Sequence, residues 1–526
     1  MLNSVDFSGR PFHFIGIGGI GMSALAYVLA SRDLPVSGSD LRLSHITERL
    51  ESHGARIFGQ QTAENLAFFA AETASTPAAS VKATQNGVSQ NGTGQSGTGQ
   101  SGTGQNGTAA ARAAQKAEIR QNQLPQIVCS TAIDDTNAEY RAAVAMGCPI
   151  FHRSDILAAL MNERKGIAIA GTHGKTTTSS ITGYLLLKAG IDPTIIIGGE
   201  VSAWKGNAYV GKSDYVVAEA DESDGSLVKL SSYLGVVTNI ELDHPDHYSN
   251  LDQVVAIFET FASQCETLIG SIDCPTVRDR LKLDISYSLE ADSGADYIAT
   301  NIREKASGTV TELWERGTKL GELTLPLLGL HNLSNALAAI AVARHLGVSF
   351  EAITTHLPHF QGARRRFEHR GFHNEILFVD DYAHHPSEIK ATLAAAQVER
   401  SGAVPSGRDR QVVAVFQPHR YSRTASLFDE FATAFEGADR ILVTDIYSAG
   451  ETNKTNITGE QITRAIAQHQ PNTEYYPTLE TVERSLSTSL TPGDIVIFLT
   501  AGNLNQIMPA VMAAYESALQ PEVALT

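Results

Sequence analysis

The fold of the chain is decided by one stretch, Ala170-Gly171-Thr172-His173-Gly174-Lys175-Thr176-Thr177-Thr178. It follows a short apolar run at residues 167–170 and precedes a helical pattern at residues 181–188. A strand, a glycine turn, a lysine, a hydroxyl residue and a helix form a phosphate-binding loop, because backbone N–H groups and the helix dipole converge on phosphate oxygens. In such a loop Lys175 reaches the β- and γ-phosphates, and Thr176 places its hydroxyl on Mg²⁺. An ordinary turn is the alternative, but it gives no reason for the lysine.

Bulk composition is that of an ordinary globular protein. The 526 residues predict about three or four domains, and 42% of them are hydrophobic. The formal net charge of -17 argues against a protein that coats nucleic acid. We expect no membrane segment, because no apolar stretch is long enough to span a bilayer. Four cysteines without metal or disulfide spacing fit a cytoplasmic protein.

The N-terminal segment has the pattern of a dinucleotide-binding unit. A strand at 12–16 leads into a G-x-G-x-x-G turn, a helical pattern at 22–31 and a strand at 35–39. An acid about 20 residues past the turn suits a ribose hydroxyl, and the glycines suit a diphosphate. The candidate residues are Gly16, Gly18, Gly19, Gly21, Ser39 and Asp40.

Residues 72–123, approximately, form a low-complexity tract with Gly/Thr/Gln repeats, which we interpret as a disordered surface insertion. Strands are expected again at 127–130 and 149–152, followed by a helix at 154–161.

Polar residues follow apolar runs in the middle of the chain. The runs at 194–197, 215–218 and 235–238 are typical of buried parallel strands. Glu219 and His244 lie where such strands end, and Mg²⁺ prefers oxygen ligands, so we take Glu219 as the first ligand candidate and His244 as the second. For three further residues the choice between ligand and solvated loop charge stays open; they are Asp221, Glu222 and Asp246.

Two asparagines begin an alanine-rich helical segment at 336–345. Asn332 and Asn335 are either helix caps or readers of a purine edge, and the sequence leaves both alternatives open.

A third α/β domain begins near Phe360. Strands are expected at 376–379, 412–416, 441–444 and 495–499, with a helix at 387–395 after the first. Polar blocks again follow the strands, with Asp380-Asp381-Tyr382-Ala383-His384-His385-Pro386 after the first and Gln417-Pro418-His419-Arg420-Tyr421-Ser422-Arg423 after the second. For His384 and His385 the alternative is that they cap the helix, and for the arginines that they form surface ion pairs.

Taken together, these blocks resemble the Mur ligase family, and they occur in the family's order over nearly the whole chain. They comprise Gly16–Gly21, Gly171–Thr178, Glu219–Asp224, Thr238–His244, His331–Asn335, Arg365–Phe367, Asp380–Pro386 and Gln417–Thr424. The resemblance implies three domains: a Rossmann-like UDP-sugar-binding domain at 1–162, a central P-loop ATPase-like domain at 163–359 and a Rossmann-like amino-acid-binding domain at 360–526. Within the family, the chain most resembles the members that add alanine.

The resemblance also implies a reaction: ligation of L-alanine to the lactyl carboxylate of UDP-N-acetylmuramate through an acyl phosphate, with ATP converted to ADP. This would be a cytoplasmic step of peptidoglycan precursor synthesis. Residues implied to be catalytic are Lys175, His244 and Arg366. Those implied to bind ATP are Gly171, Thr172, His173, Gly174, Lys175, Thr176, Thr177, Asn332, Asn335, Arg366 and Asp380. The implied Mg²⁺ ligands are Thr176, Glu219 and His244, and the implied amino-acid-binding residues are Tyr382, His385, Arg420 and Arg423.

Three rival functions are weaker. A ligase that attaches a tripeptide to the same sugar nucleotide would share the fold, and pocket shape, which the sequence does not show, decides between them. A regulator without catalysis is disfavoured by the presence of Lys175, Glu219 and His244. An oxidoreductase would leave the phosphate loop unexplained. The oligomeric state stays unassigned.

Overall fold

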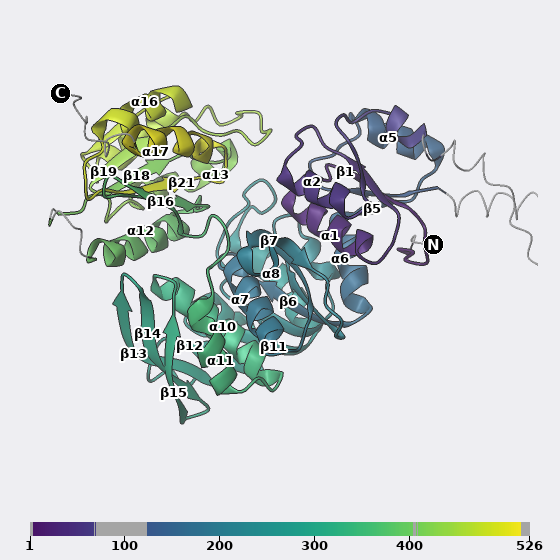
Figure 1. Ribbon diagram of the computed structural model, residues 1–526, viewed down its shortest axis with the longest axis horizontal. Helices are drawn as coiled ribbons and strands as arrows, with labels where there is room; N and C mark the ends of the chain where they lie inside the picture. Colours follow the sequence, from purple (N-terminus) through teal and green to yellow (C-terminus); the bar gives the residue numbers. More distant parts are fainter. Residues whose placement is uncertain (1–3, 68, 70–123, 403–406, 408, 517–526) are drawn as a thin grey trace, which may run out of the picture. The chain divides into compact units, whose positions relative to one another are not determined.

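A computed structural model describes residues 4–67, 69, 124–402, 407 and 409–516. The Gly/Thr/Gln-rich insertion expected at about 72–123 lies outside the described residues. Contacts divide the chain into two compact units, Met1–Ile156 and Leu157–Thr526. Three sheets with helices packed on them confirm the predicted α/β fold class (Figure 1).

The first unit contains a five-stranded parallel sheet in the order β3-β2-β1-β4-β5. Its strands are β1 (Phe12–Ile15), β2 (Val36–Ser39), β3 (Arg56–Phe58), β4 (Gln126–Cys129) and β5 (Ile150–His152). The helices are α1 (Ile20–Ala30), α2 (His45–Ser52) and α5 (Ala138–Met146), and α6 (Arg153–Asn162) follows β5. The predicted first strand, glycine turn, helix and second strand are confirmed to within two residues.

The central sheet has ten strands in the order β15-β14-β13-β12-β11-β10-β6-β9-β7-β8. Its strands are β6 (Lys165–Ala170), β7 (Thr194–Val201), β8 (Gly206–Tyr209), β9 (Tyr215–Glu219), β10 (Ser232–Val237), β11 (Cys265–Ser271), β12 (Ile285–Ser288), β13 (Tyr297–Lys305), β14 (Gly308–Glu315) and β15 (Thr318–Leu325). The helices are α7 (Lys175–Lys188), α8 (Leu251–Ser263), α9 (Pro275–Arg280), α10 (Leu330–His345) and α11 (Phe350–His356). The parallel strands from β12 to β7 carry the predicted phosphate loop between β6 and α7.

Helices α7 and α10 pack side by side and anchor this loop (Figure 1). Residues 336–343 of α10 are completely buried. Alanines supply five of these eight positions and allow two helices to approach closely. A helical segment that is apolar all round, as residues 336–343 are, belongs in the interior of a protein. The loop at the start of α7 and the first turn of α10 are therefore held by one core.

The third sheet has the order β16-β17-β21-β18-β19-β20, with only β16 antiparallel among its described strands. Its strands are β16 (Glu368–His373), β17 (Ile376–Asp381), β18 (Val412–Phe416), β19 (Arg440–Val443), β20 (Thr473–Tyr475) and β21 (Ile495–Leu499). The helices are α12 (Pro386–Arg400), α13 (Tyr421–Ser426), α14 (Phe428–Ala432), α15 (Gly459–Ala467), α16 (Leu479–Ser489) and α17 (Met508–Glu516). Alternate residues of β17 face two separate cores, one with α12, α14 and α15 and the other with α16 and α17. This sheet and the central sheet belong to the same compact unit.

Candidate functional site

The turn between β6 and α7 accepts only glycine at two positions. Gly171 has a φ of +136°, and a Cβ there would lie 2.0 Å from Thr238 Oγ1. Gly174 has a φ of +82°, and a Cβ there would lie 2.2 Å from Asn335 Oδ1. Left-handed backbone and close neighbours together exclude a side chain. The loop is thus shaped by its neighbours to keep its backbone open toward a ligand.

Lys175 is held inside the loop by its own carbonyls and by one acid. Its Nζ donates to Gly171 O at 2.7 Å and Thr172 O at 3.1 Å, and it lies 2.9 Å from Glu222 Oε2. Glu222 is 1% exposed. Burial disfavours the charged lysine, but Glu222 and Asp221 outweigh it and raise the pKa of Lys175. The sequence left Glu222 undecided, and the structure makes it the counter-ion of Lys175.

Thr176 and Glu219 come together, as two of the three predicted metal ligands. Thr176 Oγ1 donates to Glu219 at 3.0 Å and 3.1 Å, and the Gly198 N–H donates to Glu219 Oε2 at 2.7 Å. His244 is not in contact with this pair and lies against two other acids. Its Nε2 is 3.7 Å from Glu222 Oε1 and 3.6 Å from Asp243 Oδ2. A hydroxyl and a carboxylate oxygen are donors that suit a hard cation.

A cavity of about 260 Å³ lies beside the loop, between the central and third sheets. It is lined by His173, Gly174, Thr177, Thr238, Asn239, Glu241, His331, Asn332, Ser334, Asn335, Arg366, Phe367, Asp381, Ser387, Glu388, Ala391 and Thr392. Six of the twelve residues that the sequence assigned to ATP or to catalysis line this cavity: His173, Gly174, Thr177, Asn332, Asn335 and Arg366. The other six are not among its lining residues; they are Gly171, Thr172, Lys175, Thr176, His244 and Asp380.

Both asparagines of α10 face this cavity, and the alternative that they cap the helix is wrong. Position Gly329 is the N-cap of α10 and makes no side-chain cap bond in the described structure. Asn332 Nδ2 donates to Leu328 O at 2.8 Å, which fixes its amide. Asn335 places its amide against Gly174. Fixed amides beside a phosphate loop are suited to hydrogen bonds with a base.

Arg366 and Asp380 differ in their surroundings. Arg366 lines the cavity, with Nη2 3.5 Å from Thr176 Oγ1 and its guanidinium 5.3 Å from the centre of the Tyr382 ring. Asp380 is completely buried and pairs with Arg365 Nε at 3.4 Å and Arg370 Nη1 at 3.5 Å. The sequence assigned Asp380 to ATP, and its neighbour Asp381 is one of the three acids in the cavity wall, with Glu241 and Glu388.

The loops after β17 and β18 meet around a group of histidines and arginines. The rings of Tyr382 and His384 are 5.4 Å apart, and those of His384 and His419 are 5.9 Å apart. Arg423 Nη1 lies 3.3 Å from His419 Nδ1. Arg420 pairs with Asp246 Oδ2 at 3.1 Å. These loops therefore bring together most of the residues predicted to bind the amino acid.

Arg423 also reaches the central domain. Its Nε donates to Asp243 Oδ1 at 2.8 Å and its Nη2 to Asp243 Oδ2 at 3.3 Å, with both residues buried. Burial raises the pKa of Asp243, but the guanidinium outweighs it and holds that pKa well below its ordinary value. This bidentate pair was missed by the sequence reasoning, because the two residues are 180 positions apart.

His385 serves as a helix cap, which is one of the two roles that the sequence left open for it. It is the N-cap of α12: its Nδ1 accepts the Ser387 N–H at 3.2 Å, and Glu388 completes the capping box. Its ring lies 4.6 Å from that of His173. The capping alternative is thus correct for His385, and His384 is the histidine that lies against His419.

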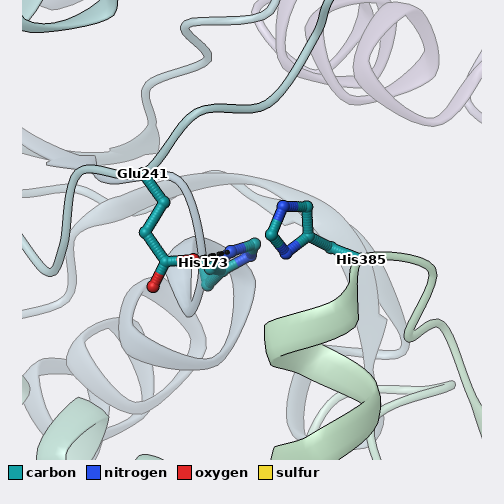
Figure 2. A group of neighbouring side chains, drawn as sticks. All are labelled: His173, Glu241 and His385. Carbon is teal, nitrogen blue, oxygen red and sulfur yellow. Dashed lines mark ion pairs between the residues drawn. The ribbon is translucent and has the colours of Figure 1, made fainter. Parts of the chain in front are cut away.

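Figure 2 shows His173, Glu241 and His385, whose ligand atoms lie within 4.8 Å of one another. Such a group suits a transition metal only if each histidine offers a lone pair. His385 Nδ1 already accepts an N–H, so its Nε2 carries the proton. His173 lies between two carboxylates, with Nε2 3.3 Å from Glu241 Oε2 and Nδ1 3.2 Å from Glu388 Oε1. The group fits an imidazolium between acids better than a metal centre.

The glycine turn of the first unit is closed by the predicted acid. The Gly18 N–H donates to Asp40 Oδ2 at 2.8 Å, and Gly16 has a φ of +85°. Gly19 is the N-cap of α1, so the helix N-terminus opens at this turn. Ser39 is directed elsewhere, since its Oγ donates to the buried Glu139 at 2.5 Å.

Three acids of the site were not singled out by the sequence: Glu241, Asp243 and Glu388. One signal was available, because Glu388 stands three residues after His385 in the spacing of a capping box. The other contacts are made across long sequence separations and leave no local pattern.

In the described ranges, none of the helices combines the length and apolar character that a membrane crossing requires.

Comparisons with known proteins give a consistent result. The chain matches the Mur ligase family catalytic domain at residues 11–95 and 89–165, the Mur ligase middle domain at 169–343 and the Mur ligase glutamate ligase domain at 365–502. A curated UDP-N-acetylmuramate–L-alanine ligase of Nostoc punctiforme is 56% identical over 515 residues, 98% of each chain. One of Synechocystis sp. is 55% identical over 513 residues, 98% of this chain and 99% of that protein.

Solved structures share the fold. The UDP-N-acetylmuramate-alanine ligase of Thermotoga maritima matches with a TM-score of 0.74 at 24% identity, covering 97% of this chain and 99% of that chain. A murein peptide ligase of Psychrobacter arcticus matches with a TM-score of 0.65 at 21% identity, covering 98% and 100%. The fold is therefore common to all three chains.

Proposed function

The chain belongs to the Mur ligase family, and we propose that it joins L-alanine to the lactyl carboxylate of UDP-N-acetylmuramate while ATP is converted to ADP and phosphate. The observation that carries this proposal is the 56% identity over 98% of both chains to a curated protein of that name. The reaction would be an early, cytoplasmic step of peptidoglycan precursor synthesis, on which cell-wall growth, cell shape and division depend.

We propose that the three domains have the bounds that the sequence implied. UDP-sugar binding is assigned to residues 1–162, ATP binding to 163–359 and amino-acid binding to 360–526. The glycine turn closed by Asp40 would receive the UDP diphosphate, because its backbone N–H groups and the start of α1 suit an anion.

ATP would occupy the cavity beside the phosphate loop. Asn332 and Asn335 would bind the base, and the backbone from Gly171 to Thr177 would bind the phosphates. When ATP binds, the ion pair between Lys175 Nζ and Glu222 would be replaced by contacts with the β- and γ-phosphates. One ammonium group cannot make close contacts with both anions at once. Arg366, 3.5 Å from Thr176 Oγ1, adds a second positive charge from the third domain. Phosphoryl transfer depends mainly on such positioning and charge neutralisation.

Mg²⁺ fits the oxygen donors that the structure brings together. Thr176 and Glu219 already lie 3.0 Å apart, and His244 is the third proposed ligand, from the loop after β10. When bound, the ion neutralises charge on the phosphates. In its absence the Gly198 N–H and the Thr176 hydroxyl satisfy the Glu219 carboxylate.

The chemistry has two steps. A lactyl carboxylate oxygen attacks the γ-phosphorus, the bond to the β-phosphate oxygen breaks, and ADP leaves. The alanine amine then attacks the acyl carbon, and phosphate leaves with the electron pair of the C–O bond. The nitrogen must lose protons in this step, so a neutral base beside the amine accelerates it.

His384 is suited to accept such a proton. Its Nδ1 donates to Tyr382 O at 2.8 Å, so the lone pair is on Nε2. Burial lowers the pKa of His384 to about 4, which keeps the ring neutral at physiological pH. So low a pKa makes His384 a weak base, so it would pass the proton on to the leaving phosphate or to solvent. The guanidinium groups of Arg420 and Arg423 would attract the alanine carboxylate to the same loops.

The test is release of phosphate and ADP from ATP and Mg²⁺ in the presence of UDP-N-acetylmuramate and a single acceptor. Release that requires L-alanine supports the proposal. Release with a tripeptide but not with alanine would move the function to peptide ligation, the activity named for the Psychrobacter arcticus structure.

A further inference from the structure

The first turn of α12 makes polar contacts with the central domain at three points. His173 Nδ1 lies 3.2 Å from Glu388 Oε1, and Ser387 Oγ donates to Glu241 Oε2 at 2.7 Å. His385 Nε2 lies 3.4 Å from Leu242 O. His173 belongs to the phosphate loop itself, so the helix is connected directly to the element that would bind ATP.

The link is an ion pair rather than a neutral hydrogen bond. His173 has a carboxylate on each side, Glu241 in its own domain and Glu388 on α12 (Figure 2 shows the Glu241 side). Burial disfavours the charged ring, but the two acids outweigh it and raise the pKa of His173 to about 10. The ring therefore carries its charge at physiological pH, and a charge-assisted bond is about twice as strong as a neutral one.

Glu388 continues the connection on the other side. Its Oε2 accepts the backbone N–H of His384 at 3.0 Å and of His385 at 3.3 Å, and it lies 3.2 Å from His384 Nδ1. One carboxylate thus holds the phosphate loop with one oxygen and the histidine loop with the other. Since His384 is the proposed proton acceptor for the amine, the two halves of the reaction meet at this acid.

We propose that His173 and Glu388 are positioning residues, whose ion pair sets the His384 loop in register with the phosphate loop. Their role rests on the proposed function for its chemical meaning, but the link itself is a property of the free protein. The pair transmits a displacement of the phosphate loop to the loop that carries Tyr382 and His384. Without it, ATP still binds to the central domain, while the amine and the acyl phosphate are no longer held together.

The experiment is amide hydrogen exchange of the full chain without substrates, at pH 7.5, read on the element opposite each substitution. His173→Gln should speed exchange about 10-fold or more in residues 384–392, because it removes a charge-assisted contact. Glu388→Gln should do the same in residues 171–178. The double variant should show no more exchange in either window than the single variants, since both remove the same pair.

Glu399→Gln is the matched control. It makes the same chemical change on the same helix, but the ion pairs of Glu399 are with Arg410 and His369 of the third domain. It should leave exchange in residues 171–178 within about twofold of the parent chain. Because the readout is local and on the opposite element, a global loss of structure would be recognised by faster exchange throughout.

A kinetic measurement separates positioning from a general structural effect. In Glu388→Gln we expect kcat for alanine ligation to fall about 10-fold or more while the Kd for ATP stays within about threefold. Unchanged exchange at 384–392 in His173→Gln would overturn the proposal. Equal exchange of the phosphate loop in Glu399→Gln and Glu388→Gln would overturn it too. If the parent chain forms no product with alanine, the proposed function fails, and the exchange results still decide the link.

Discussion

The Nζ of Lys175 lies 2.9 Å from Glu222 Oε2, so the lysine of the phosphate loop rests on an acid from the loop after β9. The loop therefore does not present a free cation to ATP. The incoming phosphates must compete with Glu222, and the same acid lies 3.7 Å from His244. Glu222 therefore lies between the lysine of the phosphate loop and a proposed metal ligand.

This relationship predicts different outcomes for activity and stability. Lys175→Ala should lower the rate of ADP formation at least about 100-fold, because charge stabilisation of this kind contributes several kcal/mol. It should also destabilise the fold by about 3–5 kcal/mol, since it leaves Glu222 buried without its partner. The double variant Lys175→Ala/Glu222→Ala should recover much of that stability and none of the activity. Urea unfolding and coupled ADP assays measure the two effects; a double variant no more stable than Lys175→Ala would contradict the pairing.

Two glycines at the ends of α7 offer a matched pair. Gly174 and Gly190 have φ values of +82° and +81°, but only Gly174 has a neighbour in the way, Asn335. Gly190→Ala should cost about 1 kcal/mol through backbone strain alone and leave ATP binding unchanged. Gly174→Ala should weaken ATP binding at least about 10-fold in calorimetry, because the loop or Asn335 must move. Equal ATP affinity in the two variants would contradict this account of the loop.

The two arginines of the amino-acid site should behave differently. Arg423→Ala should destabilise the protein by about 3–5 kcal/mol, because it leaves Asp243 buried and unpaired. Arg420 has a half-exposed ion pair, so Arg420→Ala should change stability by no more than about 1 kcal/mol. Its effect should appear instead as a higher KM for alanine. Thermal unfolding and steady-state kinetics distinguish the two, and a stable Arg423→Ala protein would refute the buried pair.

The charge of His173 predicts a dependence of stability on pH. The pKa is raised from 6.5 to about 10 in the folded protein. A raised pKa stabilises the fold fully below 6.5, and this contribution declines as the pH rises and is lost above about 10. The difference in unfolding free energy between the parent chain and His173→Gln should therefore shrink steadily from pH 6.5 to pH 10. A constant difference across that range would mean that His173 is neutral.

The sequence predicted the parts of the site whose signals are local. The phosphate loop follows from the spacing of Gly171, Gly174 and Lys175, and its place at a strand end follows from the parallel sheet. Strands β13 to β15 were not predicted, because their burial is partial and they pair within an antiparallel meander rather than in the buried parallel core.

Contacts between distant segments explain the remaining differences. The sequence left two roles open for His385, amino-acid binding and helix capping. The three-dimensional structure shows that it caps α12 and that His384 turns toward His419. Asp243 and Glu388 acquire their importance from partners 180 and 215 positions away. No periodicity or motif spacing encodes such pairs.

The central claim is tested most directly by one assay: ADP and phosphate formation from ATP, Mg²⁺ and UDP-N-acetylmuramate, with each acceptor added in turn. We expect formation of ADP, phosphate and the amide in equal amounts, and we expect all three to require L-alanine. Product with a tripeptide alone, or ATP binding without product for any acceptor, would contradict it.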